Sequence, residues 1–212
     1  MSPKVADPVR AAETEAQILG AALDLLAEGG AEALSMRALA ARVGLSATAI
    51  YNYFENKQAL VDRVVARGFG RLEGYLWSAI EPVPAGSIER LTALGEAYIR
   101  FAVENEQHFK VIFTIQPADP REIQDLPGGG GYRILRRCVV EAIDAGTVRR
   151  TDPDLLALYL WTHIHGLVTL FLACDPTAEC QDVHLQMPEG EHRMLYLFRR
   201  FVDLVRHGLV ES

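Results

Sequence analysis

The side chains best suited to chemistry in this chain form a run of hydroxyl, amide and cationic groups between Ser46 and Lys57. Such groups hydrogen-bond to the phosphates and base edges of DNA, and a lysine adds attraction to phosphate. Ile50 and Phe54 lie four residues apart within this run, so a helix here would bury both on one face. The polar residues left on its other faces would be Thr48, Tyr51, Asn52 and Tyr53.

A second short helix is predicted directly before this one, over residues 36–43. Ser35 is a helix-capping residue type, and apolar residues follow at helical spacing at positions 36, 39, 40 and 43. Gly44 lies where that helix must end, Leu45 can fill the corner, and Ser46 can cap the next helix. Two short helices joined by a glycine turn are typical of a helix-turn-helix, which places its second helix in the major groove.

The stretch from residue 21 to residue 60 resembles the N-terminal domain of the TetR (tetracycline-repressor) family of bacterial regulators. The segments AALDLLAEGG, SMRALAARVGLS and IYNYFENKQAL carry the resemblance, with Tyr51, Tyr53, Phe54, Lys57 and Leu60 as its most specific residues. It implies a three-helix DNA-binding domain over residues 12–72 and a double-stranded DNA operator as the partner. It also implies that the rest of the chain, residues 73–212, binds an effector and dimerises.

Carrying the family's contacts over by position divides the site into two groups. The resemblance implies a phosphate-side group of Ser35, Ala47, Tyr51, Tyr53 and Lys57, and a base-edge group of Arg37, Thr48, Ala49 and Asn52, with Ser46 beside them. An asparagine can pair bidentately with adenine. The family often has lysine where this chain has Ala47, and positions 46–54 contain neither lysine nor arginine. Arg37 is therefore the predicted reader of guanine.

Charge is distributed unevenly along the chain, whose formal net charge is −7. Residues 1–71 hold 8 basic and 8 acidic side chains, whereas residues 72–212 hold 13 basic and 20 acidic ones. Within residues 33–71 the numbers are 6 basic and 2 acidic, so positive charge gathers at the predicted DNA face. This modest excess predicts weak non-specific DNA binding and reliance on the geometry of a dimer.

Composition narrows the class of protein further. A chain that is 50% hydrophobic over 212 residues can bury a substantial core. Three cysteines argue against a disulfide scaffold, the N-terminus lacks the apolar core of a signal peptide, and no unbroken apolar run has membrane-spanning length. We therefore expect a soluble cytoplasmic protein. No nucleophile–base–acid set is apparent, so neither an enzyme nor a cofactor is predicted.

The periodicity predicts an all-α protein. Residues 1–12 are expected to be a disordered arm because Pro3 and Pro8 oppose helix. Prolines and glycines predict a loop over residues 114–131, and a second loop extends through Pro188. Besides the two helices described above, helices are expected over residues 12–28, 57–80, 87–105, 107–113, 132–145, 152–174 and 191–209.

The second part of the chain resembles the WHG-type ligand-binding domain of one TetR subgroup. The residues that carry this resemblance are Trp161-x-x-x-His165-Gly166 and Gln107-His108-Phe109-x-x-Ile112-Phe113. Apolar helices bearing these residues predict a cavity for a small apolar or aromatic effector, lined by Phe101, His108, Phe109, Ile112, Phe113, Trp161 and His165. An alternative stays open, in which His165 is a hydrogen-bonded core residue and Gly166 permits close helix packing.

Assembly is predicted from two apolar helices near the C-terminus. The segment 155–173 is apolar nearly all round, and the closing helix is amphipathic, so we expect them to form a four-helix interface in a homodimer. The resulting hypothesis is a repressor released from its operator by the effector. The competing hypothesis is a helical enzyme or metal-binding sensor built on His163, His165, Cys174, Cys180 and His184. The spacing of Cys174, Cys180 and His184 is not a common zinc pattern, so no metal is predicted.

Overall fold

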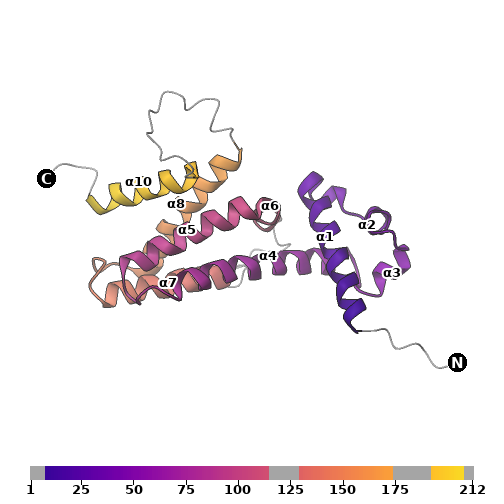
Figure 1. Ribbon diagram of the computed structural model, residues 1–212, viewed down its shortest axis with the longest axis horizontal. Coiled ribbons are helices and arrows are strands. Elements are labelled where there is room, and N and C mark those ends of the chain that lie inside the picture. Colours follow the sequence, from indigo (N-terminus) through magenta and orange to yellow (C-terminus); the bar gives the residue numbers. More distant parts are fainter. Residues whose placement is uncertain (1–7, 115–128, 174–191, 208–212) are drawn as a thin grey trace. The chain divides into compact units, whose positions relative to one another are not determined.

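A computed structural model describes residues 8–114, 129–173 and 192–207, and every regular element within these ranges is a helix (Figure 1). The predicted all-α fold is confirmed. The helices are α1 (Pro8–Ala33), α2 (Met36–Val43), α3 (Ala47–Tyr51), α4 (Lys57–Ile80), α5 (Ile88–Glu104), α6 (Glu106–Thr114), α7 (Gly129–Asp144), α8 (Pro153–Ala173) and α10 (Arg193–His207).

The chain divides into two compact units, and the boundary falls within α4. The first unit comprises Met1–Arg71 with Asn105–Glu122, and the second comprises Leu72–Glu104 with Ile123–Ser212. The first break lies next to the domain boundary expected at residues 72 and 73. The segment that contains α6, however, is grouped with the N-terminal unit, because α6 packs on α1.

The first unit is built around α1, which contacts both α2 and α6. Its core is apolar and includes Ile18, Leu39, Ile50 and Leu60, none of which has exposed surface. Burying four such side chains contributes about 1.5–3 kcal/mol each relative to leaving them in water. The helix-turn-helix is therefore held on α1 by a dry core rather than by its own few turns.

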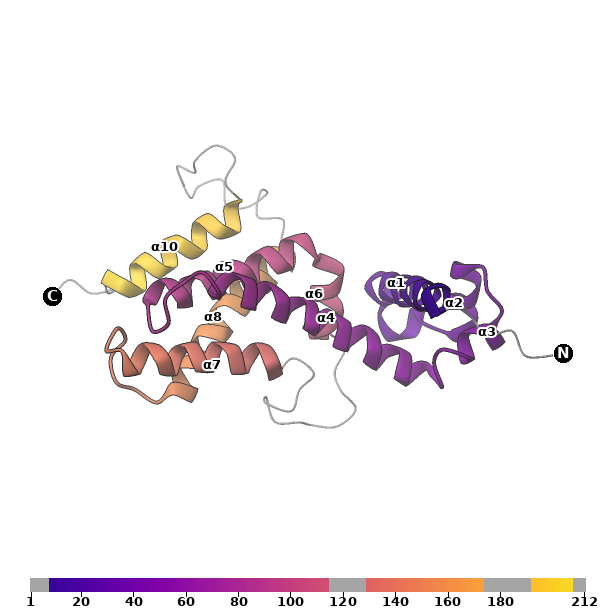
Figure 2. The same cartoon turned by 60° about the horizontal axis from the view of Figure 1, so that its bottom comes forward.

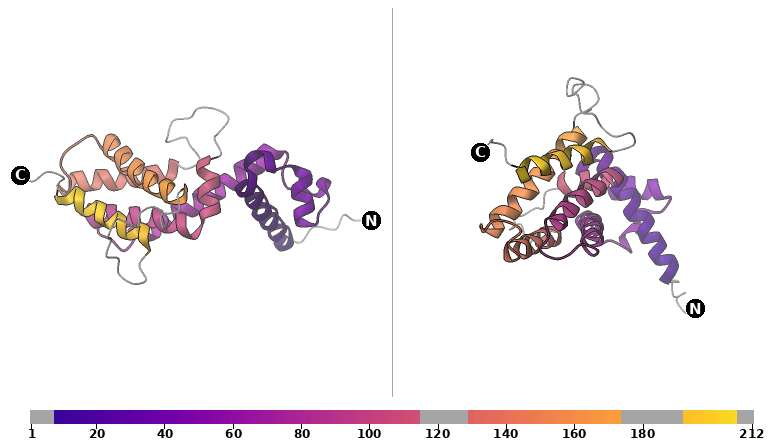
Figure 3. Two further views of the ribbon diagram at one scale, coloured as in Figure 1. Left: turned by 90° about the horizontal axis from the view of Figure 1, so that it is seen from above. Right: turned by 60° about the vertical axis from the view of Figure 1, so that its left-hand side comes forward.

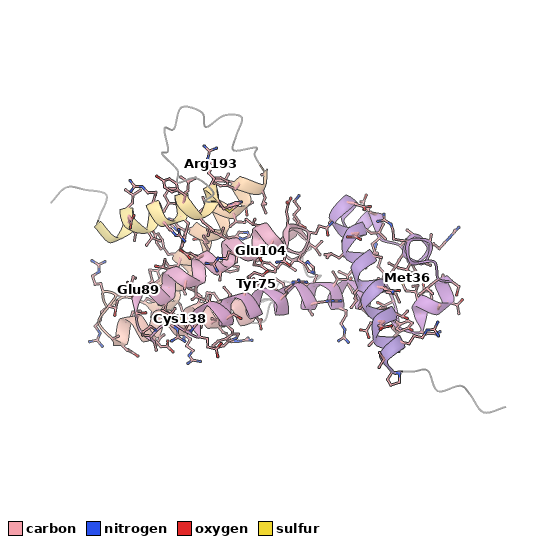
Figure 4. The ribbon with its side chains drawn as sticks, in the orientation of Figure 1. Met36, Tyr75, Glu89, Glu104, Cys138 and Arg193 are labelled. Carbon is pink, nitrogen blue, oxygen red and sulfur yellow. The ribbon has the colours of Figure 1, made fainter. Side chains whose placement is uncertain are left out.

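The second unit is a helical bundle in which α5 contacts α7, α8 and α10 (Figures 2 and 3). Glu96 of α5 accepts a hydrogen bond from Arg199 of α10 at 2.8 Å, which links the closing helix to the bundle. Tyr75 of α4 donates to the carboxylate of Glu104 at the end of α5, and the two side chains face each other (Figure 4). The predicted helix over residues 57–80 agrees with α4 at both ends.

Two helices begin about a helical turn earlier than the sequence predicts. The first starts at Pro8 rather than near residue 12, since proline is tolerated in the first turn, where its missing N–H has no helical partner. The helix α7 starts at Gly129, within the predicted loop. A side-chain carbon at Gly130 would collide with the carboxylate of Glu73 on α4, so glycine there permits close packing. Residues 115–128 and the predicted loop through Pro188 lie outside the described residues.

The helix α8 presents most of its apolar surface outside the bundle. By length and composition it could cross a membrane, which differs from the expectation that no segment could do so. Only 17% of its most apolar 18 residues are buried. A helix covered by another protein surface has the same length and composition as a membrane span. In either case the exposed apolar side of α8 needs a cover.

Candidate nucleic-acid interface

The first helix of the predicted motif is capped at both ends as the sequence indicates. The hydroxyl of Ser35 accepts a hydrogen bond from the backbone N–H of Ala38 at 3.1 Å. Gly44 has a φ of 69°, a left-handed conformation that costs glycine nothing, and its N–H donates to the carbonyl of Ala40. Met36 lies in the first turn of this helix (Figure 4). The glycine turn that the motif requires is therefore present.

The second helix follows directly and is shorter than predicted. The hydroxyl of Ser46 accepts a hydrogen bond from the N–H of Ala49 at 3.1 Å. The helix ends at Tyr51 with Asn52 as its C-terminal cap, whereas the apolar spacing of Ile50 and Phe54 predicts a helix that continues to residue 54. Ile50 and Phe54 are both buried as predicted. The inner face of the motif therefore forms without a full further turn of helix.

The polar groups proposed to contact DNA lie on the solvent side. Tyr51 is 52% exposed and Tyr53 is 37% exposed, although large aromatic side chains are usually buried. Most of the other predicted contacts are exposed, while Ala47 and Ala49 are half-buried. The exposed set comprises Ser35, Arg37, Ser46, Thr48, Asn52 and Lys57. The structure thus brings the predicted DNA-contacting residues onto α2, α3 and the segment leading into α4, and contact with DNA itself stays a prediction.

Two basic side chains near this surface are held by the protein itself. The ammonium of Lys57 donates to the backbone carbonyl of Ala31, which fixes the start of α4 against the end of α1. Because a carbonyl carries no net charge, Lys57 keeps its full positive charge for a phosphate. The guanidinium of Arg42 instead makes two hydrogen bonds to the carboxylate of Glu28, at 3.0 and 2.8 Å. These bonds lower the pKa of Glu28, and Arg42 adds little positive charge to the surface.

Three of the residues predicted to line an effector cavity lie in the second unit. Tyr98 is 5% exposed, and its hydroxyl lies 2.8 Å from Nδ1 of His165. The ring of Trp161 lies 6.3 Å from that of His165, and Tyr132 lies 6.1 Å from Trp161. Phe101 is fully buried and packs edge-on against Tyr75. We call Tyr98, Tyr132, Trp161 and His165 the aromatic cluster.

Burial sets the protonation of this cluster. It raises the pKa of the Tyr98 hydroxyl well above its usual value, against a smaller opposite effect of a hydrogen bond with Trp161. Burial also lowers the pKa of His165, so its imidazole is neutral near pH 7. The Tyr98 hydroxyl and Nδ1 of His165 share a hydrogen bond at 2.8 Å, and the tautomer of the neutral imidazole determines which of the two groups donates.

The other four predicted cavity residues lie on α6 in the first unit. Phe109 and Ile112 are buried there, with 3% and 5% of their surface exposed. Phe113 lies 4.8 Å from Phe109 and 5.7 Å from Phe69 of α4, measured between ring centroids. His108 is half-buried beside them. The seven residues thus form two groups in two compact units, and a cavity shared by all of them stays a prediction.

Two members of the aromatic cluster, Tyr98 and Tyr132, were not predicted from the sequence. Tyr98 and His165 are 67 positions apart, so no local pattern pairs them. One signal was available, because a tyrosine in the apolar stripe of a helix must find a partner for its hydroxyl. Among the described residues, no group of three or more His, Cys, Asp or Glu could hold a metal ion. Cys174, Cys180 and His184, the alternative metal or redox site, lie outside those residues.

Comparison with known proteins gives matches to both parts of the chain. Residues 18–64 match a family described as bacterial regulatory proteins of the tetR family, and residues 91–183 match one described as the tetracyclin repressor-like C-terminal domain. The HTH-type transcriptional repressor KstR of Rhodococcus jostii (strain RHA1) is 39% identical over 61 residues. That match spans 29% of this chain and 29% of the repressor.

Solved structures share the fold over nearly the whole chain. The TetR family transcriptional regulator PfmR from Thermus thermophilus has a TM-score of 0.67 at 23% identity, covering 92% of this chain and 99% of that one. The transcriptional regulator FadR from Bacillus subtilis, in complex with stearoyl-CoA, has a TM-score of 0.71 at 17% identity with the same coverage. At these identities the likeness establishes the architecture.

Proposed function

The chain belongs to the TetR family of bacterial transcriptional regulators, and from that premise we propose that it is a homodimeric cytoplasmic repressor released from its operator by a small apolar effector. It acts by binding and not by catalysis. The observation that carries the proposal is the helix-turn-helix, with Ser35 and Ser46 as caps, Gly44 in the turn and exposed tyrosines on its outer face. The fold itself does not require two exposed aromatic rings on that face, whereas DNA binding would use them.

Dimerisation is supported by two apolar surfaces that a single chain leaves open. On α8 the exposed residues Leu155, Tyr159 and Leu170 recur at helical spacing, with Leu155 63% and Leu170 64% exposed. On α10, which contacts α8, Phe201, Leu204 and Val205 are 45–62% exposed. Two adjacent helices with open apolar faces suit a four-helix interface about a two-fold axis. That interface would cover α8 without a membrane.

Effector binding is supported by the aromatic cluster of the second unit. Its four aromatic rings, with the buried hydroxyl of Tyr98 bonded to His165 as a polar pair among them, suit a largely hydrophobic ligand. The FadR structure that shares this fold holds stearoyl-CoA, a ligand with a long apolar chain. We propose that the effector of this chain is likewise largely hydrocarbon, and that it favours a state in which the DNA-binding units no longer fit the operator.

Substitutions on α3 and α4 test the DNA-binding assignment. Asn52→Ala should cost about 1–3 kcal/mol on the specific operator while leaving random DNA unaffected, because asparagine reads a base edge. Lys57→Ala should weaken binding to both DNAs equally and reduce the salt dependence by about one phosphate contact. Fluorescence anisotropy over a salt series measures both effects.

Lys110→Ala on α6 is the matched control, since Lys110 pairs with Glu106 outside the motif. If Asn52→Ala lowered the affinity for both DNAs alike, its base-reading role would be wrong.

A further inference from the structure

The first unit contains a hollow between α1, α4 and α6 that is separate from the aromatic cluster. Its volume is about 90 Å³. A single water needs about 10–15 Å³ of such space, so the hollow has room for a phosphate or carboxylate group. Its apolar wall includes Leu19 and Leu23 of α1 and Val64 of α4, all of them buried.

Among the described residues, the polar side chains that line the hollow include no carboxylate. Arg67 and Arg71, one helical turn apart on α4, line it together with His108 of α6. Within the part of the chain that the structure describes, neither arginine has an ion pair or a hydrogen bond to a side chain. Arg63, one turn earlier, pairs with Glu15 at 3.3 Å. Both arginines are exposed at the hollow, and like charges at this spacing repel each other, a repulsion that a bound anion would relieve.

The positive charges of the two arginines also affect the pKa of the His108 imidazole. Burial, then Arg71 and then Arg67, lower the pKa of His108. No carboxylate of the described residues acts on this ring in the opposite direction. His108 is therefore neutral near pH 7 and can donate one hydrogen bond into the hollow. Two cationic forks and one neutral donor around a small space form a geometry that suits an oxyanion.

We propose that this hollow binds a small oxyanion, the carboxylate or phosphate group of a metabolite. Arg67 and Arg71 hold its oxygens, His108 donates a hydrogen bond to it, and the apolar wall accommodates a short hydrocarbon part. The bound anion would connect α4 with α6 and so stabilise the unit that carries the helix-turn-helix. This inference does not depend on the identity of the effector or of the operator.

Isothermal titration of the full chain with sodium phosphate and with sodium hexanoate, at ionic strength held constant with chloride, tests the proposal. Saturable binding of one anion per chain is expected. Tighter binding of hexanoate would identify an organic carboxylate, and tighter binding of phosphate would identify a phosphate group. Arg67→Gln combined with Arg71→Gln should weaken binding by at least about tenfold, because two charge-assisted interactions are lost.

Two further variants separate a built site from general attraction of anions. Arg149→Gln with Arg150→Gln removes the same charge from exposed arginines of the second unit and should leave the affinity within about twofold. Gly20→Leu keeps both arginines but fills the hollow, because Gly20 lines it and a side-chain carbon there meets nothing within 4 Å. This variant should abolish binding. Binding that does not saturate, that falls equally in the Arg149 and Arg150 variant, or that persists in Gly20→Leu would overturn the proposal.

Discussion

Replacing Leu170 and Phe201 together by glutamate should convert the proposed dimer to a monomer and weaken operator binding by about 100-fold or more, because the second half-site then no longer binds at high effective concentration. Both side chains are already exposed in the single chain, Leu170 by 64% and Phe201 by 45%. Their replacement should therefore leave the folded protomer intact, whereas four carboxylates in a four-helix interface are costly to bury.

Sedimentation equilibrium and operator anisotropy on the same samples measure this effect. Val103→Glu is the matched control, because Val103 is a 38% exposed apolar residue that lies on α5 and not on α8 or α10. It should change neither the mass nor the affinity. A wild-type protein that is monomeric at micromolar concentration, or a double variant that remains dimeric, would show that α8 and α10 do not form the interface.

Trp161→Ala should abolish the response to effector while leaving operator affinity in its absence within about a few fold, since effector coupling requires differential contacts at the effector site. The probe is the compound that most weakens operator binding in a panel of fatty acids, acyl thioesters and aromatic compounds.

Tyr98→Phe provides a second test of the effector site. It removes the hydroxyl that holds Nδ1 of His165 and frees the ring to change tautomer, so the effector response should weaken without being lost.

Thermal unfolding distinguishes a ligand contact from core packing. Trp161 is only half-buried, so its truncation should cost less than the about 3–5 kcal/mol of a fully buried tryptophan. Trp161→Phe, which keeps a ring at this position, should retain part of the response at nearly wild-type stability. If DNA binding, stability and response decline together in both variants, Trp161 is a structural residue and the aromatic cluster is not the effector site.

The helix-turn-helix could be predicted because its signals are local. Ser35, Gly44 and Ser46 act on backbone groups within a few residues of themselves, and both caps and the left-handed turn are confirmed. The end of α3 was predicted too late because the buried Phe54 does not need helical φ and ψ to reach the core. Apolar spacing establishes which side chains are buried, and it places helix ends less well.

Features that depend on contacts between distant segments could not be predicted. The glycines at 129–131 favour a loop when considered alone, yet α7 begins there because its first turn packs close to Glu73. The pairing of Tyr98 with His165 and the packing of α6 on α1 are likewise tertiary. The hollow at Arg67 and Arg71 also depends on tertiary contacts, because the sequence alone shows these arginines only as members of a basic stretch.

Selection of genomic fragments by the purified protein measures whether this chain binds DNA as a two-fold symmetric dimer through α3. We expect enrichment of an imperfect palindrome whose half-site centres lie a whole number of turns apart, each turn about 10–10.5 base pairs or 34–36 Å. Salt should weaken that binding steeply. Recovery of fragments with no shared sequence, or of a single unrepeated site bound by one chain, would show that the chain does not bind an operator as a symmetric dimer.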